Sequence, residues 1–133
     1  MIKVSTLIQK PISKVWEKFT NPDDVMQWNH ASKDWYCPKA TNDLTLGGEF
    51  HYTMGSRDGK FSFVLSGTYT LITENSQLEH TLEDGRKVMV SFTENIDGVQ
   101  VIQLFEPESE NSPKYQQNGW QAILDNFKLH CES

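Results

Sequence analysis

The C-terminal segment carries the clearest hydrophobic periodicity in this chain. Large apolar side chains recur there at positions i, i+3, i+4, i+7 and i+11, namely Trp120, Ile123, Leu124, Phe127 and Cys131. This spacing places them on one face of a helix. A polar linker, residues 108–113, precedes the segment and ends in Ser112-Pro113, a helix-starting pair. The pattern predicts one long amphipathic C-terminal helix, whose apolar face must be buried against the rest of the chain.

The N-terminal segment predicts a strand and then a helix. Residues 2–8 are apolar and β-branched, and the run ends before Pro11, which has no N–H to donate within a sheet. Proline is well suited to the first turn of a helix, where that N–H is not needed. We expect a helix from there to Thr20, because apolar residues repeat at helical spacing: Ile12, Val15, Trp16 and Phe19.

A second short helix is expected from Pro22 to Trp28, with Asn21 as its N-cap and acidic residues in its first turn. Residues 29–43 show no periodicity and predict a long loop. Loops of that length in a compact domain are often functional. The loop carries two large aromatic side chains that favour a place at the rim of a pocket, Trp35 and Tyr36.

Between residues 44 and 106 the hydrophobic period becomes two, which is typical of half-buried strands. Turn signals interrupt the pattern at Asp58-Gly59, Asn75-Ser76, Asp84-Gly85 and Asp97-Gly98. Gly67 is expected to break a strand or to form a bulge. Strands are therefore predicted over about 44–54, 60–66, 68–73, 77–82, 87–94 and 99–106. With the N-terminal strand they make an antiparallel sheet of about seven strands.

The order of these elements and several local motifs resemble a known family. The motifs are Val15-Trp16 after Pro11, Asn21-Pro22 followed by Trp28, Leu46-Gly47-Gly48-Glu49-Phe50, Asp58-Gly59, Gly67-Thr68-Tyr69 and Gly119-Trp120. Together they resemble the branch named after the activator of heat-shock protein 90 ATPase, within the START and birch-pollen-allergen (SRPBCC) superfamily. The resemblance spans nearly the whole chain.

This resemblance implies an α+β helix-grip fold, in which a curved antiparallel sheet (β-α-α-β6-α) wraps around the long C-terminal helix. It implies a single domain over residues 1–133, with a cavity between sheet and helix. Superfamily members bind lipids, sterols, polyketides or hormones, and some catalyse cyclisation or dehydration. The fold alone fixes none of these activities. Chaperone activation is a weaker expectation, because the better-established chaperone-binding element of the larger proteins is absent from this chain.

Composition narrows the classes of partner. The chain has 133 residues, four Trp, seven Phe and four Tyr, and a formal net charge of −6 without any run of Lys or Arg. Nucleic acid and membrane surfaces are therefore not expected as partners. No signal segment and no membrane-spanning stretch are recognisable. We expect a cytoplasmic protein whose two cysteines are free thiols, Cys37 and Cys131.

Strand parity and the helical stripe give a set of candidate pocket residues. The set assumes that the face carrying Tyr52 is concave, since a slip of one residue would bring His51 inward instead. Tyr hydroxyls, if buried, require a partner or a ligand, and Gly119 is expected to allow close approach of the helix to the sheet. The candidates are Trp28, Trp35, Phe50, Tyr52, Met54, Phe63, Leu65, Tyr69, His80, Val90, Phe92, Trp120, Leu124 and Phe127.

His80 is the sharpest polar candidate, because it alternates with Leu78 and Leu82 and therefore shares their apolar face. It is more often a core residue than an acid or base in such a position. No metal-ligand spacing and no catalytic constellation are recognisable, so neither a metal nor a cofactor is expected.

Three readings remain open on the sequence. The favoured one is a binding protein for a small, largely hydrophobic molecule, lipid or polyketide-like, monomeric or homodimeric. The second is a cyclase or dehydratase that uses the same cavity with His80 as acid or base. The third is a protein-interaction module, for example a chaperone partner. Plain core packing without a ligand-sized cavity is the structural alternative to the first two.

Overall fold

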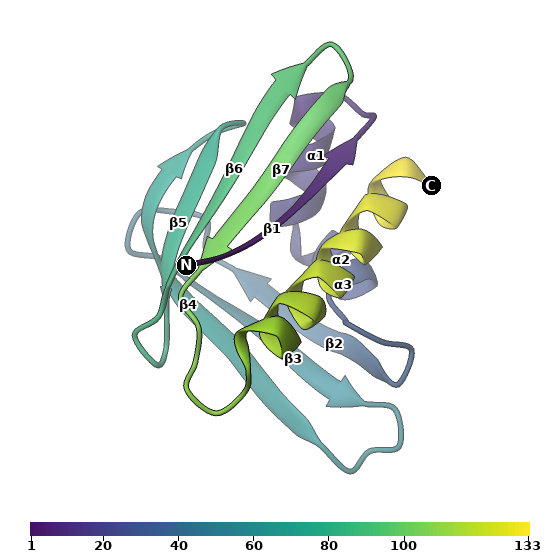
Figure 1. Ribbon diagram of the computed structural model, residues 1–133, viewed down its shortest axis with the longest axis vertical. Helices are drawn as coiled ribbons and strands as arrows, with labels where there is room; N and C mark the ends of the chain where they lie inside the picture. The colour runs from purple at the N-terminus through teal and green to yellow at the C-terminus, as the bar shows by residue number, and fades with distance from the viewer.

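The computed structural model describes residues 1–133 as one curved seven-stranded antiparallel sheet with three helices (Figure 1). The strands are β1 (Ile2–Ile8), β2 (Trp35–Asn42), β3 (Glu49–Ser56), β4 (Ser62–Thr73), β5 (Gln77–Leu82), β6 (Lys87–Asn95) and β7 (Gly98–Phe105). The helices are α1 (Ile12–Thr20), α2 (Pro22–Trp28) and α3 (Pro113–Glu132). The strand order is β1-β7-β6-β5-β4-β3-β2. This confirms the predicted α+β helix-grip fold.

The helix starts follow from the predicted caps. The Asn21 side chain accepts a hydrogen bond from the Asp23 N–H at 3.0 Å, and Pro22 occupies the first turn of α2. The Ser112 hydroxyl accepts one from the Tyr115 N–H at 3.1 Å at the start of α3. These bonds satisfy backbone donors that a helix leaves unpaired at its N-terminus. None of the helices is both long and apolar enough to cross a membrane.

The segment from 29 to 43, predicted as a loop, contains a strand, so that prediction is wrong. β2 is an edge strand that pairs only with β3, and its register shifts between Tyr36 and Lys39, around Pro38. The shift destroys the period of two, because two successive exposed residues, Pro38 and Lys39, follow the buried Cys37. Hydrogen bonds to β3, which the hydrophobic pattern does not encode, hold this strand in the sheet.

Gly67 does not break a strand, which is a second correction: residues on both sides of it belong to the single strand β4. Gly67 lies opposite Phe50, and a Cβ atom built on it would lie 2.7 Å from a carbon of the Phe50 ring. The glycine is required there for close packing. The irregularity lies instead between Tyr69 and Leu71. It reverses the alternation along the strand, so Tyr69 is buried whereas Leu71, two residues further on, is exposed.

Helix α3 runs along the edge strand β1, and its side chains bond to backbone groups of β1 that have no neighbouring strand. The Gln121 side-chain amide accepts from the Ser5 N–H at 3.3 Å and donates to the Ser5 carbonyl at 2.9 Å. The Gln117 amide donates to the Lys3 carbonyl at 3.0 Å. Gly119 does not provide close contact as expected, since nothing lies within 4 Å of a Cβ built on it. Side-chain hydrogen bonds to the edge of β1 therefore help to position the helix, together with its buried apolar face.

Candidate functional site

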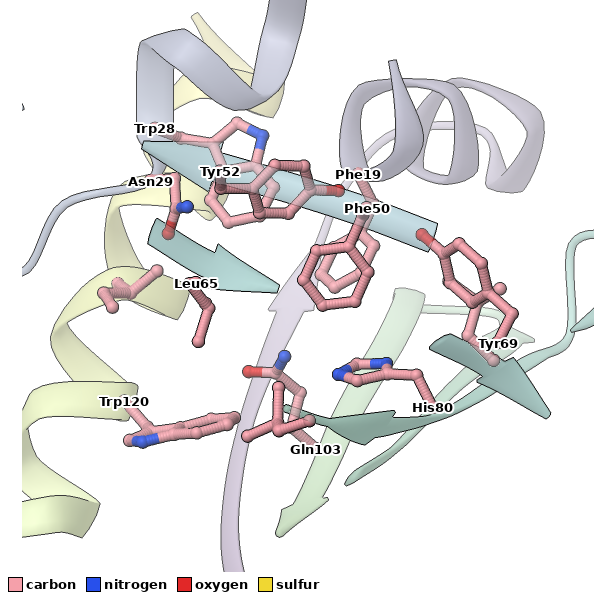
Figure 2. Close-up of a pocket in the computed structure, with 13 residues that line it drawn as sticks. Phe19, Trp28, Asn29, Phe50, Tyr52, Leu65, Tyr69, His80, Gln103 and Trp120 are labelled. Carbon is pink, nitrogen blue, oxygen red and sulfur yellow. The ribbon is translucent and has the colours of Figure 1, made fainter. Parts of the chain in front are cut away.

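A cavity of about 90 Å³ lies between the concave face of the sheet and the three helices. Figure 2 shows its walls: strands β3, β4 and β5 supply one side, and α3 supplies Trp120 on the other. Ten of its thirteen lining residues are hydrophobic. The lining residues are Phe19, Trp28, Asn29, Phe50, Tyr52, Leu65, Tyr69, Leu78, His80, Leu82, Gln103, Trp120 and Ile123.

Half of the predicted pocket residues line this cavity. They come from elements far apart in the sequence, which the sheet brings together within one apolar wall. The face that carries Tyr52, and not His51, is the concave one, since Tyr52 is buried and lines the cavity. The predicted residues in the lining are Trp28, Phe50, Tyr52, Leu65, Tyr69, His80 and Trp120.

The other predicted residues do not line the cavity, and two physical reasons account for them. The residues of the first group belong to the close-packed core, which leaves no space beside them. They are Met54, Val90, Phe92, Leu124 and Phe127. The second group lies at the far end of the β3–β4 hairpin, beyond the cover of the helices. There Phe63 is 53% exposed, and its ring packs edge-on against Trp35 at a centroid distance of 5.8 Å.

Six lining residues were not among the predicted ones: Phe19, Asn29, Leu78, Leu82, Gln103 and Ile123. Most of them carry a visible signal, because they belong to the predicted apolar faces. Gln103 in particular continues the alternation of Val99 and Val101 towards Phe105, so its parity alone turns it inward. Asn29 follows α2 without any periodic signal.

His80 is the most unusual polar group of the cavity. It lies opposite Tyr69 in β4 and Val88 in β6, and its ring packs edge-on against Phe50 at 4.9 Å. Burial lowers the pKa of His80 from 6.5 to about 4, so the imidazole is neutral at pH 7. Its Nδ1 is the one buried side-chain nitrogen or oxygen of the chain that has no hydrogen-bond partner. Figure 2 shows the ring directed into the cavity.

The two tyrosine hydroxyls of the lining, by contrast, have protein partners. The Tyr69 hydroxyl donates to Asn42 Oδ1 at 2.7 Å, and Asn42 Nδ2 donates to the Thr20 carbonyl at 2.7 Å. Burial raises the pKa of Tyr69 to about 12. Burial, and then the neighbouring Tyr69, raise the pKa of Tyr52 well above its usual value. These hydroxyls connect β2, β3 and β4 to α1, and they are engaged with the protein.

The electrostatic character of the cavity is neutral, since none of its lining residues is Lys, Arg, Asp or Glu. The other histidines lie outside it. His51 is exposed on the convex face beside Glu49, and His130 Nε2 lies 2.8 Å from Asp24 Oδ1, linking α3 to α2. No three His, Cys, Asp or Glu side chains gather into a metal-binding group. Cys37 is a free thiol, as is Cys131.

Comparison with known proteins identifies the family. Residues 9–132 match the family model described as Activator of Hsp90 ATPase homolog 1-like protein, and the chain therefore belongs to that family. An AHSA1-like protein of Aeromonas hydrophila, solved by NMR, is 37% identical with a TM-score of 0.92, over 97% of this chain and 90% of that one. A protein of Cytophaga hutchinsonii is 41% identical with a TM-score of 0.85, over 96% and 89% of the two chains.

More distant structures share the fold alone. A protein of Staphylococcus aureus, described as of unknown function, is 18% identical with a TM-score of 0.73, over 98% of this chain and 91% of that chain. No curated protein matches the sequence. Family membership thus fixes the architecture, and the chemistry of the site has to be argued from the residues of this chain.

Proposed function

We propose that the chain binds a small, largely apolar molecule in the cavity between the sheet and helices α2 and α3. The observation that carries the proposal is the unpartnered imidazole of His80 in a largely apolar wall. A buried polar group without a hydrogen bond costs about 1–3 kcal/mol. A ligand that hydrogen-bonds to Nε2, the ring nitrogen that the protein does not enclose, satisfies one of the two polar atoms of the imidazole, whereas plain core packing at this position satisfies neither.

The size of the cavity supports a small ligand over a long lipid chain. Its volume is about 90 Å³, whereas drug-sized ligands occupy pockets of roughly 300–1,000 Å³ and benzene occupies an engineered cavity of about 150 Å³. Six of the lining residues are half-buried, and three of these belong to β4 and α3: Leu65, Trp120 and Ile123. A ligand slightly larger than the cavity can therefore extend between β4 and α3.

The proposal is tested with toluene as an apolar probe, titrated into ¹⁵N-labelled protein and followed by amide NMR shifts. We expect saturable shifts confined to the lining segments of β3, β4, β5 and α3. The matched variant Ile123→Trp fills the mouth of the cavity and should abolish these shifts while the rest of the spectrum is retained. Shifts that are absent, or that scatter over the surface and persist in Ile123→Trp, would rule out a ligand cavity.

An enzymatic use of the same cavity is the weaker proposal. General acid–base catalysis is most efficient with a group whose pKa lies near the working pH, and burial moves the pKa of His80 down to about 4. No carboxylate or lysine of the lining stands beside His80 to exchange a proton with it. A neutral imidazole in such a setting orients a ligand better than it transfers protons, and binding therefore remains the preferred function.

One observation favours a protein-interaction surface as a second candidate. The β3–β4 hairpin exposes three apolar side chains, Phe61, Phe63 and Val64, with exposed fractions of 64%, 53% and 51%. Such patches often mark contact sites between proteins. If the hairpin forms a homodimer, light scattering should give twice the monomer mass, and Phe63→Ser should return it to the monomer mass. A monomer at every concentration would remove the homodimer.

A further inference from the structure

We propose that His80 and Gln103 recognise a neutral carboxamide or lactam group, so that the ligand of this cavity is a small uncharged amide. The inference rests on the proposed function and specifies the chemical class of its ligand. It comes from the two side chains of the lining that combine an inward position with a complete lack of protein hydrogen bonds.

The sheet places these two side chains on its concave face, in neighbouring cross-strand rows. His80 shares its row with Phe105, and Gln103 shares its row with Leu78. His80 belongs to β5 and Gln103 to β7, and one strand, β6, lies between them. Gln103 lies opposite Val90 in β6 and Val4 in β1, so its cross-strand neighbours offer no hydrogen-bonding side chain. Both side chains line the same cavity, and Figure 2 shows the Gln103 amide and the His80 ring directed towards its interior. An apolar residue at either position would continue the surrounding wall.

The hydrogen-bonding capacities of the pair are complementary to an amide. A neutral imidazole has one donor nitrogen and one acceptor nitrogen. Nδ1 of His80 is enclosed without a partner, and we assign the lone pair to it, so that Nε2–H donates into the cavity. The Gln103 side chain offers a carbonyl oxygen as acceptor. A ligand C=O can then accept from His80 while the ligand N–H donates to Gln103.

The lack of charge in the wall selects against ionised ligands. Transfer of an unpaired carboxylate or ammonium group into an apolar environment costs far more than transfer of a neutral amide. No lysine, arginine, aspartate or glutamate lines the cavity to compensate such a charge. A carboxylic acid offers the same donor and acceptor as an amide only while it is protonated, and at neutral pH it is ionised. The neutral amide therefore fits this cavity best.

The experiment compares four probes of similar shape: benzamide, benzoate, benzamidine and toluene. The first three are nearly isosteric and carry a neutral, a negative and a positive group, and toluene carries no polar group. Dissociation constants are measured at about pH 7.5 by NMR titration of ¹⁵N-labelled protein. We expect benzamide to bind at least about tenfold more tightly than each of the other three, since unpaired polar groups in a site discriminate strongly.

Variants then connect this preference to the two side chains. Gln103→Leu and His80→Leu should bring the affinity for benzamide down to that for toluene, while toluene binds each variant about as well as wild type. His80→Gln keeps a donor and should retain part of the preference. The dispersion of each amide spectrum reports whether the variant is folded, so a loss of preference in a folded variant is attributable to recognition.

The outcomes separate this inference from the proposed function. If toluene binds the cavity and benzamide shows no advantage over benzoate or toluene, the amide assignment is wrong and the apolar binding function stands. The assignment is equally wrong if benzamide binds preferentially and both leucine variants keep that preference. If none of the four probes binds, the proposed function fails and the amide assignment fails with it.

Discussion

His80 should make the stability of this protein fall in acid. Its pKa is lowered to about 4 by burial, from an ordinary value of 6.5. A base whose pKa is lower in the folded state binds its proton more readily in the unfolded state. The stabilisation is therefore complete above about pH 6.5, and it is lost progressively as the pH falls towards 4.

The size of the effect follows from the difference in pKa. One unit corresponds to about 1.4 kcal/mol, so a shift from 6.5 to about 4 amounts to roughly 3 kcal/mol when the acid limit is reached. Between about pH 7 and pH 4.5 the loss is about 2 kcal/mol. For a domain whose total stability is on the order of 5–15 kcal/mol, this is a large fraction.

The assay is urea unfolding followed by tryptophan fluorescence at about pH 7, 5.5 and 4.5. Carboxylates also titrate in this range, so the difference between wild type and His80→Gln is the informative quantity. That difference should change by about 2 kcal/mol in favour of the variant as the pH falls. His51→Gln is the matched control, because His51 is exposed on the opposite face, and it should follow wild type. Parallel pH profiles for wild type and His80→Gln would refute the burial argument.

Three further predictions concern packing around the cavity, each measured by chemical denaturation. Gly67→Ala should cost about 1–3 kcal/mol, because its Cβ would lie 2.7 Å from the Phe50 ring; a cost that does not shrink in a Phe50→Leu background would contradict this contact. Phe127→Ala should cost about 3–5 kcal/mol, since Phe127 is fully buried; a loss below about 1 kcal/mol would mean that its surroundings are loosely packed. Gly119→Ala should stabilise the protein by about 0.5–1 kcal/mol, because a Cβ at this position has open space. A lower free energy of unfolding for this variant would contradict the prediction.

Much of the fold could be predicted from the sequence where local chemistry decides it. The boundaries of α2 follow from an N-cap, a proline and a short apolar run, and the hairpin turns follow from Asp-Gly pairs. β2 could not be predicted, because an edge strand with a register shift buries one thiol, Cys37, and exposes most of its other side chains. Its place in the sheet depends on hydrogen bonds to β3, which leave no period of two in the sequence.

The candidate site was predictable to a smaller extent, for a geometric reason. Parity gives the face on which a strand residue lies, but it does not give the position of that residue along the strand relative to the helices. Met54 and Phe63 lie opposite each other on one face, yet Met54 is buried and Phe63 is 53% exposed at the end of the hairpin. Gln103 could have been predicted from the sequence, because it is a polar residue at an inward-facing position of a strand whose other inward residues are apolar.

The existence of the cavity follows from the way in which α3 is attached. A helix that packs by its apolar face alone settles over the middle of a sheet and closes the space beneath it. In this protein polar side chains of α3 bond to the open edge of β1: Gln121 to Ser5 and Lys128 to the Leu7 carbonyl at 2.6 Å. The ring of Trp120 is stacked on that of Phe105 in the adjacent strand β7, with 3.8 Å between the ring centroids. Because these contacts hold the helix over β1 and β7, it cannot fill the concavity above β3, β4 and β5. The bonds that protect the sheet edge therefore also keep a space open beside His80.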